Sequence, residues 1–210
     1  MENVDINTND ERVLCQCYKL KVMAKVYEFI ANGSEEIEAL TVVDVLRRAG
    51  VECVTVSINE TEEVLMSHGV RVSCDMKIAD ADFSDADMLL LPGGLPGATN
   101  LNECEAVRSA MQRQFEEGKK VGAICAAPLV LGSLGILKGK RATCYPGFEN
   151  QMTGAEYTHE LYTIDGNVIT GEGPAATLPY SYAILEMLGK QAEAAQLREG
   201  MMFNHLLSSK

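Results

Sequence analysis

Short apolar runs alternate with amphipathic segments along this chain, and that alternation limits the folds it can adopt more than any other feature. Residues 25–31, KVYEFIA, are short and β-prone, and residues 35–50 carry apolar side chains at helical spacing. Further apolar runs occupy residues 51–58, 87–94 and 119–125. Continuous apolar strands separated by helices are typical of a largely parallel sheet that is covered on both faces. The sequence therefore predicts an α/β fold.

The remaining segments extend this pattern toward the C-terminus. The helix over 35–50 has acidic residues at its start and Gly50 as a stop, and we expect Ser34 to cap it. The other predicted helices cover residues 103–117, 126–137, 174–189 and 191–202. Residues 141–146 are predicted as a strand, and residues 64–76 and 159–170 as hairpins.

Composition and charge argue against several classes of protein. The net charge of −12 disfavours nucleic acid as a partner, because phosphate binding needs a basic face. No apolar run is long enough to span a bilayer, and the N-terminus lacks the apolar segment of a signal peptide. The seven cysteines show no zinc-site spacing, so we predict no metal and a cytoplasmic protein with reduced thiols. We expect residues 1–22 to be an irregular extension of a single domain over 23–210.

The segment AICAAP, residues 123–128, contains the first candidate catalytic residue. A nucleophile elbow needs small residues two places before and two places after the nucleophile, and Ala123 and Ala127 hold those places. Cys125 would then have a strained backbone and lie exposed at a helix start, which favours its thiolate. The N–H of Ala126 could face a developing oxyanion. The alternative is a buried, inert cysteine.

Two further features lie close to the ends of predicted strands, where open α/β sheets bind ligands. Gly93 and Gly94 let the backbone approach another group closely and could donate N–H groups to an anion beside Cys125; the alternative is a simple turn. Glu38 lies near the apolar stripe of its helix, so we expect its carboxyl to point inward over the sheet. Burial and a neighbouring thiolate would favour its protonated form, whereas a solvated acid is the alternative.

Four motifs in this order and spacing resemble the ThiJ/PfpI superfamily: ANGSEEIEALTVVDVLRRAG, LLLPGGLPGATNL, AICAAP and GEGP. Within it they resemble the branch that contains the Parkinsonism-associated protein deglycase. The resemblance covers roughly residues 24–190. It implies a flavodoxin-like three-layer sandwich of the class I glutamine amidotransferase-like kind, usually a homodimer. It also implies that Cys125 is the nucleophile, Glu38 the conserved glutamate, and Gly94 and Ala126 the backbone oxyanion donors.

The chain departs from the pattern of this superfamily at two positions that matter for chemistry. The deglycase branch often has a histidine before the proline where this chain has Tyr145, which is a poor general base at neutral pH. The protease-like branch has a histidine directly after the cysteine where this chain has Ala126, which disfavours peptidase activity and glutamine hydrolysis. Tyr145, Gly93 and His68 are therefore auxiliary candidates, and the resemblance implies that His68 could approach the site of the other subunit.

Two functions fit these residues. The first is a cofactor-independent enzyme that acts on reactive dicarbonyls or glycated adducts, of glyoxalase III or deglycase type, in stress protection. A small aldehyde or dicarbonyl would be its substrate, and Cys125 would attack the aldehyde carbon. The second is a non-enzymatic redox sensor or chaperone, because a reactive thiolate at Cys125 would oxidise readily to sulfenic and sulfinic acid. The sequence does not separate these two functions.

Overall fold

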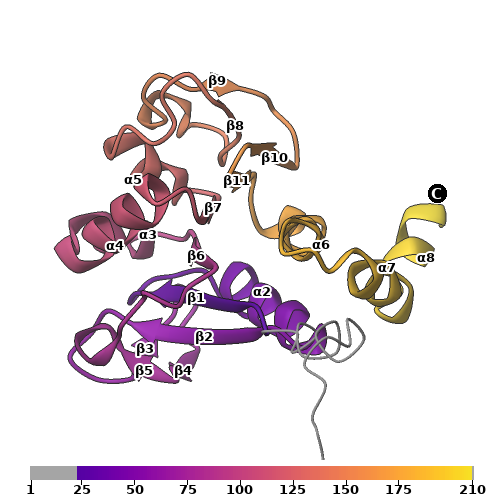
Figure 1. The fold of residues 1–210 in the computed structure, drawn as a ribbon, viewed down its shortest axis with the longest axis horizontal. Helices are drawn as coiled ribbons and strands as arrows, with labels where there is room; N and C mark the ends of the chain where they lie inside the picture. The colour runs from indigo at the N-terminus through magenta and orange to yellow at the C-terminus, as the bar shows by residue number, and fades with distance from the viewer. Residues whose placement is uncertain (1–22, 210) are drawn as a thin grey trace, which may run out of the picture.

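A seven-stranded sheet divides the molecule into three layers in the computed structural model, which describes residues 23–209. The sheet runs through the centre of the view in Figure 1, with helices on both of its faces. The predicted N-terminal extension, residues 1–22, lies outside the described residues.

The strands of the sheet follow the order β10-β11-β7-β6-β1-β2-β5. All neighbouring pairs are parallel except β10 and β11, which form an antiparallel hairpin at one edge. The bounds of these strands are β1 Lys25–Ile30, β2 Glu52–Ser57, β5 Met76–Lys77, β6 Met88–Leu91, β7 Lys120–Ile124, β10 Tyr162–Asp165 and β11 Val168–Gly171. The four residues of β6 and all but the first residue of β1 and β7 are buried, as the continuous apolar runs predicted.

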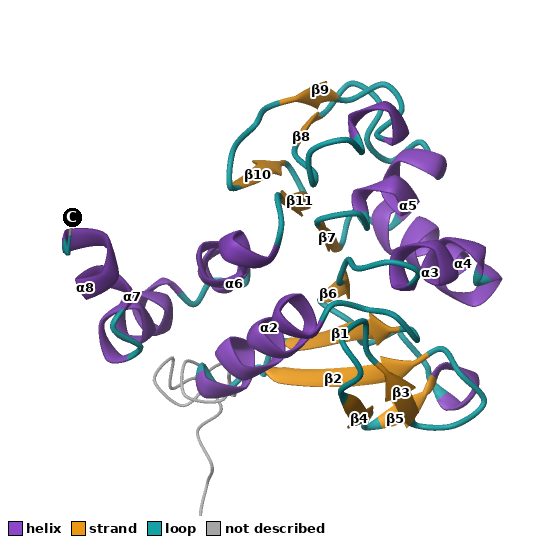
Figure 2. Cartoon of the chain, turned by 180° about the vertical axis from the view of Figure 1, so that it is seen from behind, coloured by secondary structure: helices purple, strands orange, loops and turns teal. Residues whose placement is uncertain are grey.

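Helices cover both faces of this sheet. Helices α2 (Glu36–Arg48) and α6 (Thr177–Met187) lie side by side on one face, and α3, α4 and α5 lie on the other (Figures 1 and 2). The bounds of the other helices are α3 Gly97–Glu103, α4 Glu105–Glu116, α5 Pro128–Ser133, α7 Gln191–Gly200 and α8 Phe203–Ser208. Short 3₁₀ helices cover Ile78–Asp80, Glu149–Gln151 and Pro174–Ala176. This arrangement confirms the predicted flavodoxin-like α/β sandwich. Within the described part of the chain, no helix has both the length and the apolar character needed to cross a membrane.

One short hairpin and one short parallel ladder lie outside the main sheet. Strands β3 (Glu63–Leu65) and β4 (Arg71–Ser73) pair antiparallel around the predicted turn at His68 and Gly69. Strands β8 (Arg141–Ala142) and β9 (Glu156–Tyr157) form a parallel ladder of two residues each.

Three details of the predicted fold are wrong. The strand expected over residues 141–146 is only two residues long, because the N–H of Thr143 donates instead to the side-chain hydroxyl of Thr170. The helix expected over residues 103–117 is present as α4, but it begins after Cys104, whose backbone is extended, and the preceding helix α3 was not predicted. Ser34 does not cap α2: its hydroxyl accepts the N–H of Ala31, and Glu35 is the N-cap.

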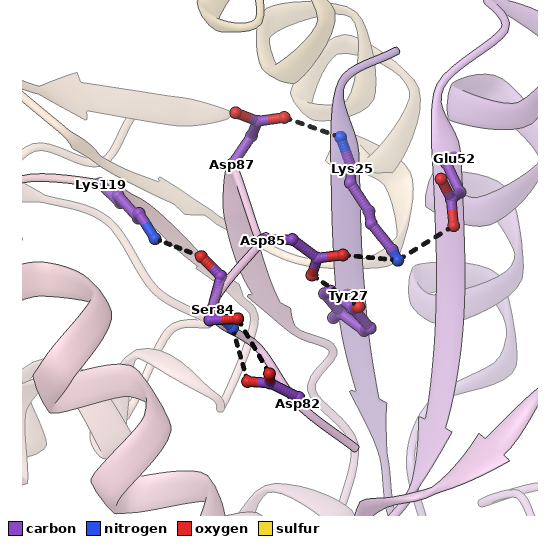
Figure 3. A network of polar contacts seen from close by, with 8 residues as sticks. All are labelled: Lys25, Tyr27, Glu52, Asp82, Ser84, Asp85, Asp87 and Lys119. Carbon is purple, nitrogen blue, oxygen red and sulfur yellow. Dashed lines mark hydrogen bonds and ion pairs between the residues drawn. The ribbon is translucent and has the colours of Figure 1, made fainter. Parts of the chain in front are cut away.

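The amino ends of the central strands are held together by an exposed polar network (Figure 3). Lys25 is the first residue of β1. Its Nζ lies 2.8 Å from Oδ2 of Asp85 and 3.2 Å from Oε1 of Glu52. Oδ1 of Asp85 also accepts the hydroxyl of Tyr27, and the backbone N–H of Lys25 donates to Asp87. These contacts join the starts of β1 and β2 to the segment before β6. Chemistry-bearing residues instead gather at the opposite, carboxyl ends of the strands.

Candidate active site

Cys125 directly follows β7, in the turn that leads to α5. Its φ of +63° lies in the left-handed region, which residues other than glycine rarely adopt, so the predicted strained backbone is present. Its N–H donates to the carbonyl of Gly171 at 2.9 Å, and its own carbonyl accepts the N–H of Tyr145 at 2.8 Å. The flanking Ala123 and Ala127 are completely buried. Small neighbours therefore allow the chain to bend sharply between strand and helix, as the sequence predicted.

Glu38 reaches Cys125 from the first turn of α2. The carboxyl group is completely buried, its Oε2 accepts the N–H of Gly93 at 2.9 Å, and the side chain interacts with the Cys125 thiol. The side chain of Glu35 caps the helix by accepting the N–H of Glu38 at 2.8 Å. This cap fixes the start of α2, and with it the position of the Glu38 carboxyl.

Gly93 makes the contact between Glu38 and Cys125 possible. A Cβ at this position would lie 2.6 Å from the Cβ of Cys125 and 2.6 Å from Oε2 of Glu38. Gly94 is equally constrained, because its φ is +85° and a Cβ there would lie 2.5 Å from the backbone nitrogen of Glu35. The double glycine after β6 is thus required by close packing, and a simple turn would not require it.

The N–H groups of Gly94 and Ala126 both hydrogen-bond the sulfur of Cys125. They come from different segments, one after β6 and the other after β7. Two fixed donors at one sulfur form the kind of site that stabilises a thiolate or a developing oxyanion. The structure therefore brings together Cys125, Glu38 and the two predicted backbone donors.

Burial dominates the ionisation of both side chains in this pair. It raises the pKa of Glu38 to about 7, and the charge of Glu35 adds to this effect. Burial, followed by the neighbouring Glu38, raises the pKa of the Cys125 thiol, whereas the N–H groups of Gly94 and Ala126 lower it. Above pH 7 the pair therefore holds one proton between sulfur and carboxyl. When that proton is on Glu38, Cys125 is a thiolate.

The predicted exposure and low pKa of Cys125 are wrong. Only 8% of the residue is exposed. The loss of water on burial disfavours the thiolate more than the two N–H donors favour it. The thiol therefore depends on Glu38 to accept its proton.

Tyr145 lies beside Cys125 through its backbone, while its ring points elsewhere. The ring lies against Gly173, where a Cβ would be 3.1 Å from Cδ2 of the tyrosine, and the residue is 47% exposed. Together with Leu161, Glu172 and Pro174 it lines a pocket of about 250 Å³. Sequence analysis missed this pocket: the GEGP motif, residues 171–174, covers part of its second wall, but a motif does not show which distant residues lie opposite it.

His68 is an exposed residue that pairs with α2 of its own chain. Its Nδ1 lies 2.7 Å from Oε2 of Glu36, and its N–H donates to Oε1 of the same carboxylate at 2.6 Å. Although burial acts to raise it, these hydrogen bonds lower the pKa of Glu36 to about 2. None of the three histidines hydrogen-bonds Cys125, and His159 and His205 are exposed.

Glu35, Glu36 and His68 form the one group of described residues whose donor atoms lie close enough to share a metal ion. Both oxygens of Glu36 already accept hydrogen bonds from His68, and Oε2 of Glu35 accepts the helix N–H of Glu38. The group therefore fits a closed hydrogen-bonded cluster that fastens the 66–70 turn to α2.

Comparison with known proteins identifies the family. Residues 24–187 match the model of the DJ-1/PfpI family, and the chain belongs to this family. It is 36% identical over 170 residues to DJ-1 homolog B of Arabidopsis thaliana, with 80% of this chain covered. The chain spans 39% and 42% of the lengths of the two Arabidopsis DJ-1 homologues that it matches.

Two shorter relatives have names that state an activity. A glutathione-independent glyoxalase of Caenorhabditis elegans is 34% identical over 159 residues, covering 75% of this chain and 84% of the relative. A deglycase of Pyrococcus horikoshii is 32% identical over 167 residues, covering 78% and 99%. Among solved structures, oxidized DJ-1 from Toxoplasma gondii superposes with a TM-score of 0.82 at 33% identity, covering 85% of this chain and 98% of that one.

Proposed function

We propose that this protein is a cofactor-independent enzyme that uses Cys125 to convert reactive dicarbonyls or glycated adducts, as a lyase or hydrolase in stress protection. The observation that carries the proposal is the completely buried carboxyl of Glu38 beside Cys125, which has a strained backbone at the end of β7. The similarity to a named glyoxalase and a named deglycase supports the same class of substrate. No step of the proposed reaction needs a metal or a bound cofactor.

The reaction with methylglyoxal would begin when the Cys125 thiolate attacks the aldehyde carbon. The new C–S bond displaces the carbonyl π electrons onto oxygen, and the N–H groups of Gly94 and Ala126 stabilise that oxyanion. Glu38 protonates it, and as a carboxylate then removes the proton from the former aldehyde carbon and returns one to the neighbouring carbon, while the hydroxyl proton passes from the first oxygen to the second. The resulting thioester is hydrolysed by water to lactate and the free thiol.

The test is methylglyoxal consumption by the purified protein without glutathione or added metal. We expect Cys125→Ser to lower turnover at least about 1000-fold. Cys104→Ser is the matched control, because Cys104 lies at the break between α3 and α4 and touches none of the site residues described above. Equal turnover by the wild type and Cys125→Ser would exclude the proposal.

Redox sensing is the second candidate function. A sulfur that two N–H groups and a carboxyl already contact could hold the oxygens of a sulfinate, and one structural relative is described as oxidized. The limited exposure of Cys125 argues that oxidation is slow. Mass spectrometry after peroxide treatment would detect oxidation as two oxygen atoms added to the Cys125 peptide. This result, together with no turnover of methylglyoxal, would favour redox sensing.

A cysteine peptidase is the weakest candidate. Peptide hydrolysis needs an oriented base and an acid for the leaving amine. Ala126 follows the cysteine directly, and the ring of Tyr145 lies over Gly173. His68 is engaged by Glu36. The site therefore offers no histidine to a peptide substrate.

We also propose that the protein is a homodimer and is cytoplasmic. On the outer face of α2, Ile37 is 54% and Leu40 is 37% exposed, beside a groove that Leu178 and Met201 also line. An exposed apolar groove of this kind is typical of a protein–protein interface. Light scattering of the wild type and Ile37→Asp would test it: a monomeric wild type excludes the dimer.

A further inference from the structure

The ring of Tyr180, on α6, occupies space that side chains on two neighbouring strands would otherwise take. Tyr180 is 1% exposed. A Cβ at Gly122, on β7, would lie 2.7 Å from its hydroxyl oxygen, and a Cβ at Gly171, on β11, would lie 2.9 Å from its Cδ2. Glycine within a strand is typical of a place where another group approaches the backbone closely. Both glycines are therefore needed for this ring to lie against the sheet.

These two glycines lie on one face of the sheet, close to its carboxyl edge. Gly171 lies opposite Ile124 in the parallel pairing of β7 and β11. Because side chains along a strand alternate between its two faces, Gly122 and Ile124 share a face. The ring therefore spans β7 and β11 where these strands approach the turn of Cys125.

Gly171 connects the ring to the nucleophile. Its carbonyl accepts the N–H of Cys125 at 2.9 Å, and Cys125 has a φ of +63°. A residue other than glycine keeps such a conformation only where the surrounding contacts enforce it. The Tyr180 ring restricts Gly171, because a shift of that backbone toward α6 would bring it into the ring.

The hydroxyl of Tyr180 is buried and has no hydrogen-bond partner among the described residues. Burial, followed by the charges of Glu28 and Glu38, raises the pKa of this phenol well above its usual value, so it stays neutral. A neutral hydroxyl without a partner supplies neither a charge nor a hydrogen bond. The contribution of Tyr180 therefore lies in the shape of its ring.

We propose that Tyr180 is a positioning residue: its ring, packed against the two glycines, keeps Cys125 in its strained conformation. In that conformation the N–H groups of Gly94 and Ala126 both reach the sulfur. Tyr180 acts on the thiol through Gly171. For turnover this inference rests on the proposed function, whereas for the reactivity of the thiol it stands by itself.

Alkylation of Cys125 by iodoacetamide tests the inference without requiring turnover. Mass spectrometry of the Cys125 peptide gives the rate at each pH, and the pH midpoint of that rate reports how well the thiolate is stabilised. A change in access to the sulfur scales the rate equally at every pH and leaves the midpoint in place. We expect Tyr180→Leu to raise the midpoint by about one pH unit, because a displaced sulfur loses its N–H donors. An unchanged midpoint would overturn the proposal.

Tyr182→Leu is the matched control for a loss of stability. Tyr182 is 0% exposed and lies on the same helix, but its ring packs against Phe203. Both leucine variants leave a cavity and should lower the urea midpoint of unfolding, yet only Tyr180→Leu should shift the pH midpoint. A pH shift of the same size in Tyr182→Leu would reduce the role of Tyr180 to general stability and overturn the proposal.

Tyr180→Phe separates the ring from the hydroxyl. Because it keeps the ring, it should restore most of the reactivity that Tyr180→Leu loses. A midpoint as high as that of Tyr180→Leu would assign the effect to the hydroxyl and overturn the role of the ring.

Gly122→Ala tests the same contact from the strand, and serves if Tyr180→Leu does not fold. Its methyl group would meet the Tyr180 hydroxyl and displace the ring, so we expect the midpoint to rise. Adding Tyr180→Phe removes that hydroxyl and should recover part of the shift. Strictly additive effects of the two substitutions would overturn the contact.

Turnover separates this inference from the proposed function. We expect Tyr180→Leu to lower kcat for methylglyoxal about tenfold, with KM within about threefold, since the ring lies behind the nucleophile. Full turnover with an unchanged midpoint would overturn this inference and keep the proposed function. A shifted midpoint in a protein whose wild type shows no turnover would remove the proposed function and keep the role of Tyr180.

Discussion

Two buried glutamates, ten positions apart in the chain, differ in what surrounds them. Glu38 and Glu28 are 0% and 1% exposed, and burial raises the pKa of both. Oε1 of Glu38 and Oε2 of Glu28 are both buried, unpartnered atoms. Oε2 of Glu38, however, accepts the N–H of Gly93 and its carboxyl interacts with Cys125, whereas the Glu28 side chain has no hydrogen bond to a described residue. Burial alone therefore does not make an active-site acid; the neighbouring sulfur and N–H groups do.

Glu28 lies in the middle of β1, where its strand neighbours provide no hydrogen-bond partner for its carboxyl group. In register it faces Thr55 on β2 and Leu90 on β6. The hydroxyl of Thr55 is already bonded to Asp75, and Leu90 is apolar. The nearest compensation is the charge of Arg47, which lowers the Glu28 pKa less than burial raises it. We therefore expect Glu28 to be protonated and to destabilise the fold.

The largest expected difference between the two glutamates is in catalysis. Glu38→Gln removes the group that accepts the Cys125 proton and moves it between carbons, so we expect kcat/KM for methylglyoxal to fall at least about 100-fold. Glu28→Gln should leave it within about twofold. Because the Cys125–Glu38 pair loses its first proton near pH 7, wild-type kcat/KM should rise with pH up to that value and then level. If kcat/KM fell equally in Glu38→Gln and Glu28→Gln, the two glutamates would not differ in catalysis.

The next effect is on stability. Glu28→Leu replaces a buried, unpartnered carboxyl by an apolar side chain, and we expect the free energy of unfolding to rise by about 1–3 kcal/mol at pH 7.5. Urea denaturation followed by circular dichroism measures it. A loss of stability would show that Glu28 has a partner in solution, such as a buried water, and would weaken the comparison.

The pH dependence of this gain follows from the raised pKa of Glu28. Above about pH 4.3 the unfolded chain releases this proton and the folded chain keeps it, so wild-type stability falls as pH rises. The advantage of Glu28→Gln should thus be near zero at pH 4 and grow by up to about 1.4 kcal/mol per pH unit. For Glu38→Gln the same growth should stop near pH 7, where folded Glu38 itself ionises. If the stability gains of Glu28→Gln and Glu38→Gln depended on pH in the same way, the proposed difference between the two sites would be wrong.

Sequence patterns predicted the parts of this molecule that local chemistry decides. Apolar runs located β1, β2, β6 and β7, and the small residues around Cys125 predicted its strained turn. The RATCYP segment was predicted wrongly, because a side-chain hydroxyl on β11 replaces its backbone partner. Alternation along β1 places Glu28 on the same face as Val26 and Ile30, but its burial depends on α2 and α6 packing over that face.

The candidate site also has features that the sequence predicted and features that it did not. The motifs named Cys125, Glu38 and the two glycines, whose spacing along the chain is local information. The burial of Cys125 arises in a core cluster of residues that are distant in the chain. The raised pKa of its thiol follows from that burial and could not be predicted from the sequence.

The smallest expected effect contrasts the buried glutamates with an exposed carboxylate at the other end of the sheet. The hydrogen bond from Lys25 lowers the pKa of Asp85, which is 55% exposed. Stability from such a group is present above its unfolded pKa, about 3.9, and is lost as pH falls through the folded value. Asp85→Asn should therefore lower Tm by at most about 3 °C at pH 7, and by less at pH 3 or in 1 M NaCl. Both effects grow as pH rises, but their signs are opposite: Asp85→Asn lowers stability and Glu28→Gln raises it. Calorimetry of both variants at pH 3, 5 and 7 would measure it, and a Tm loss for Asp85→Asn that grows toward pH 3 would refute it.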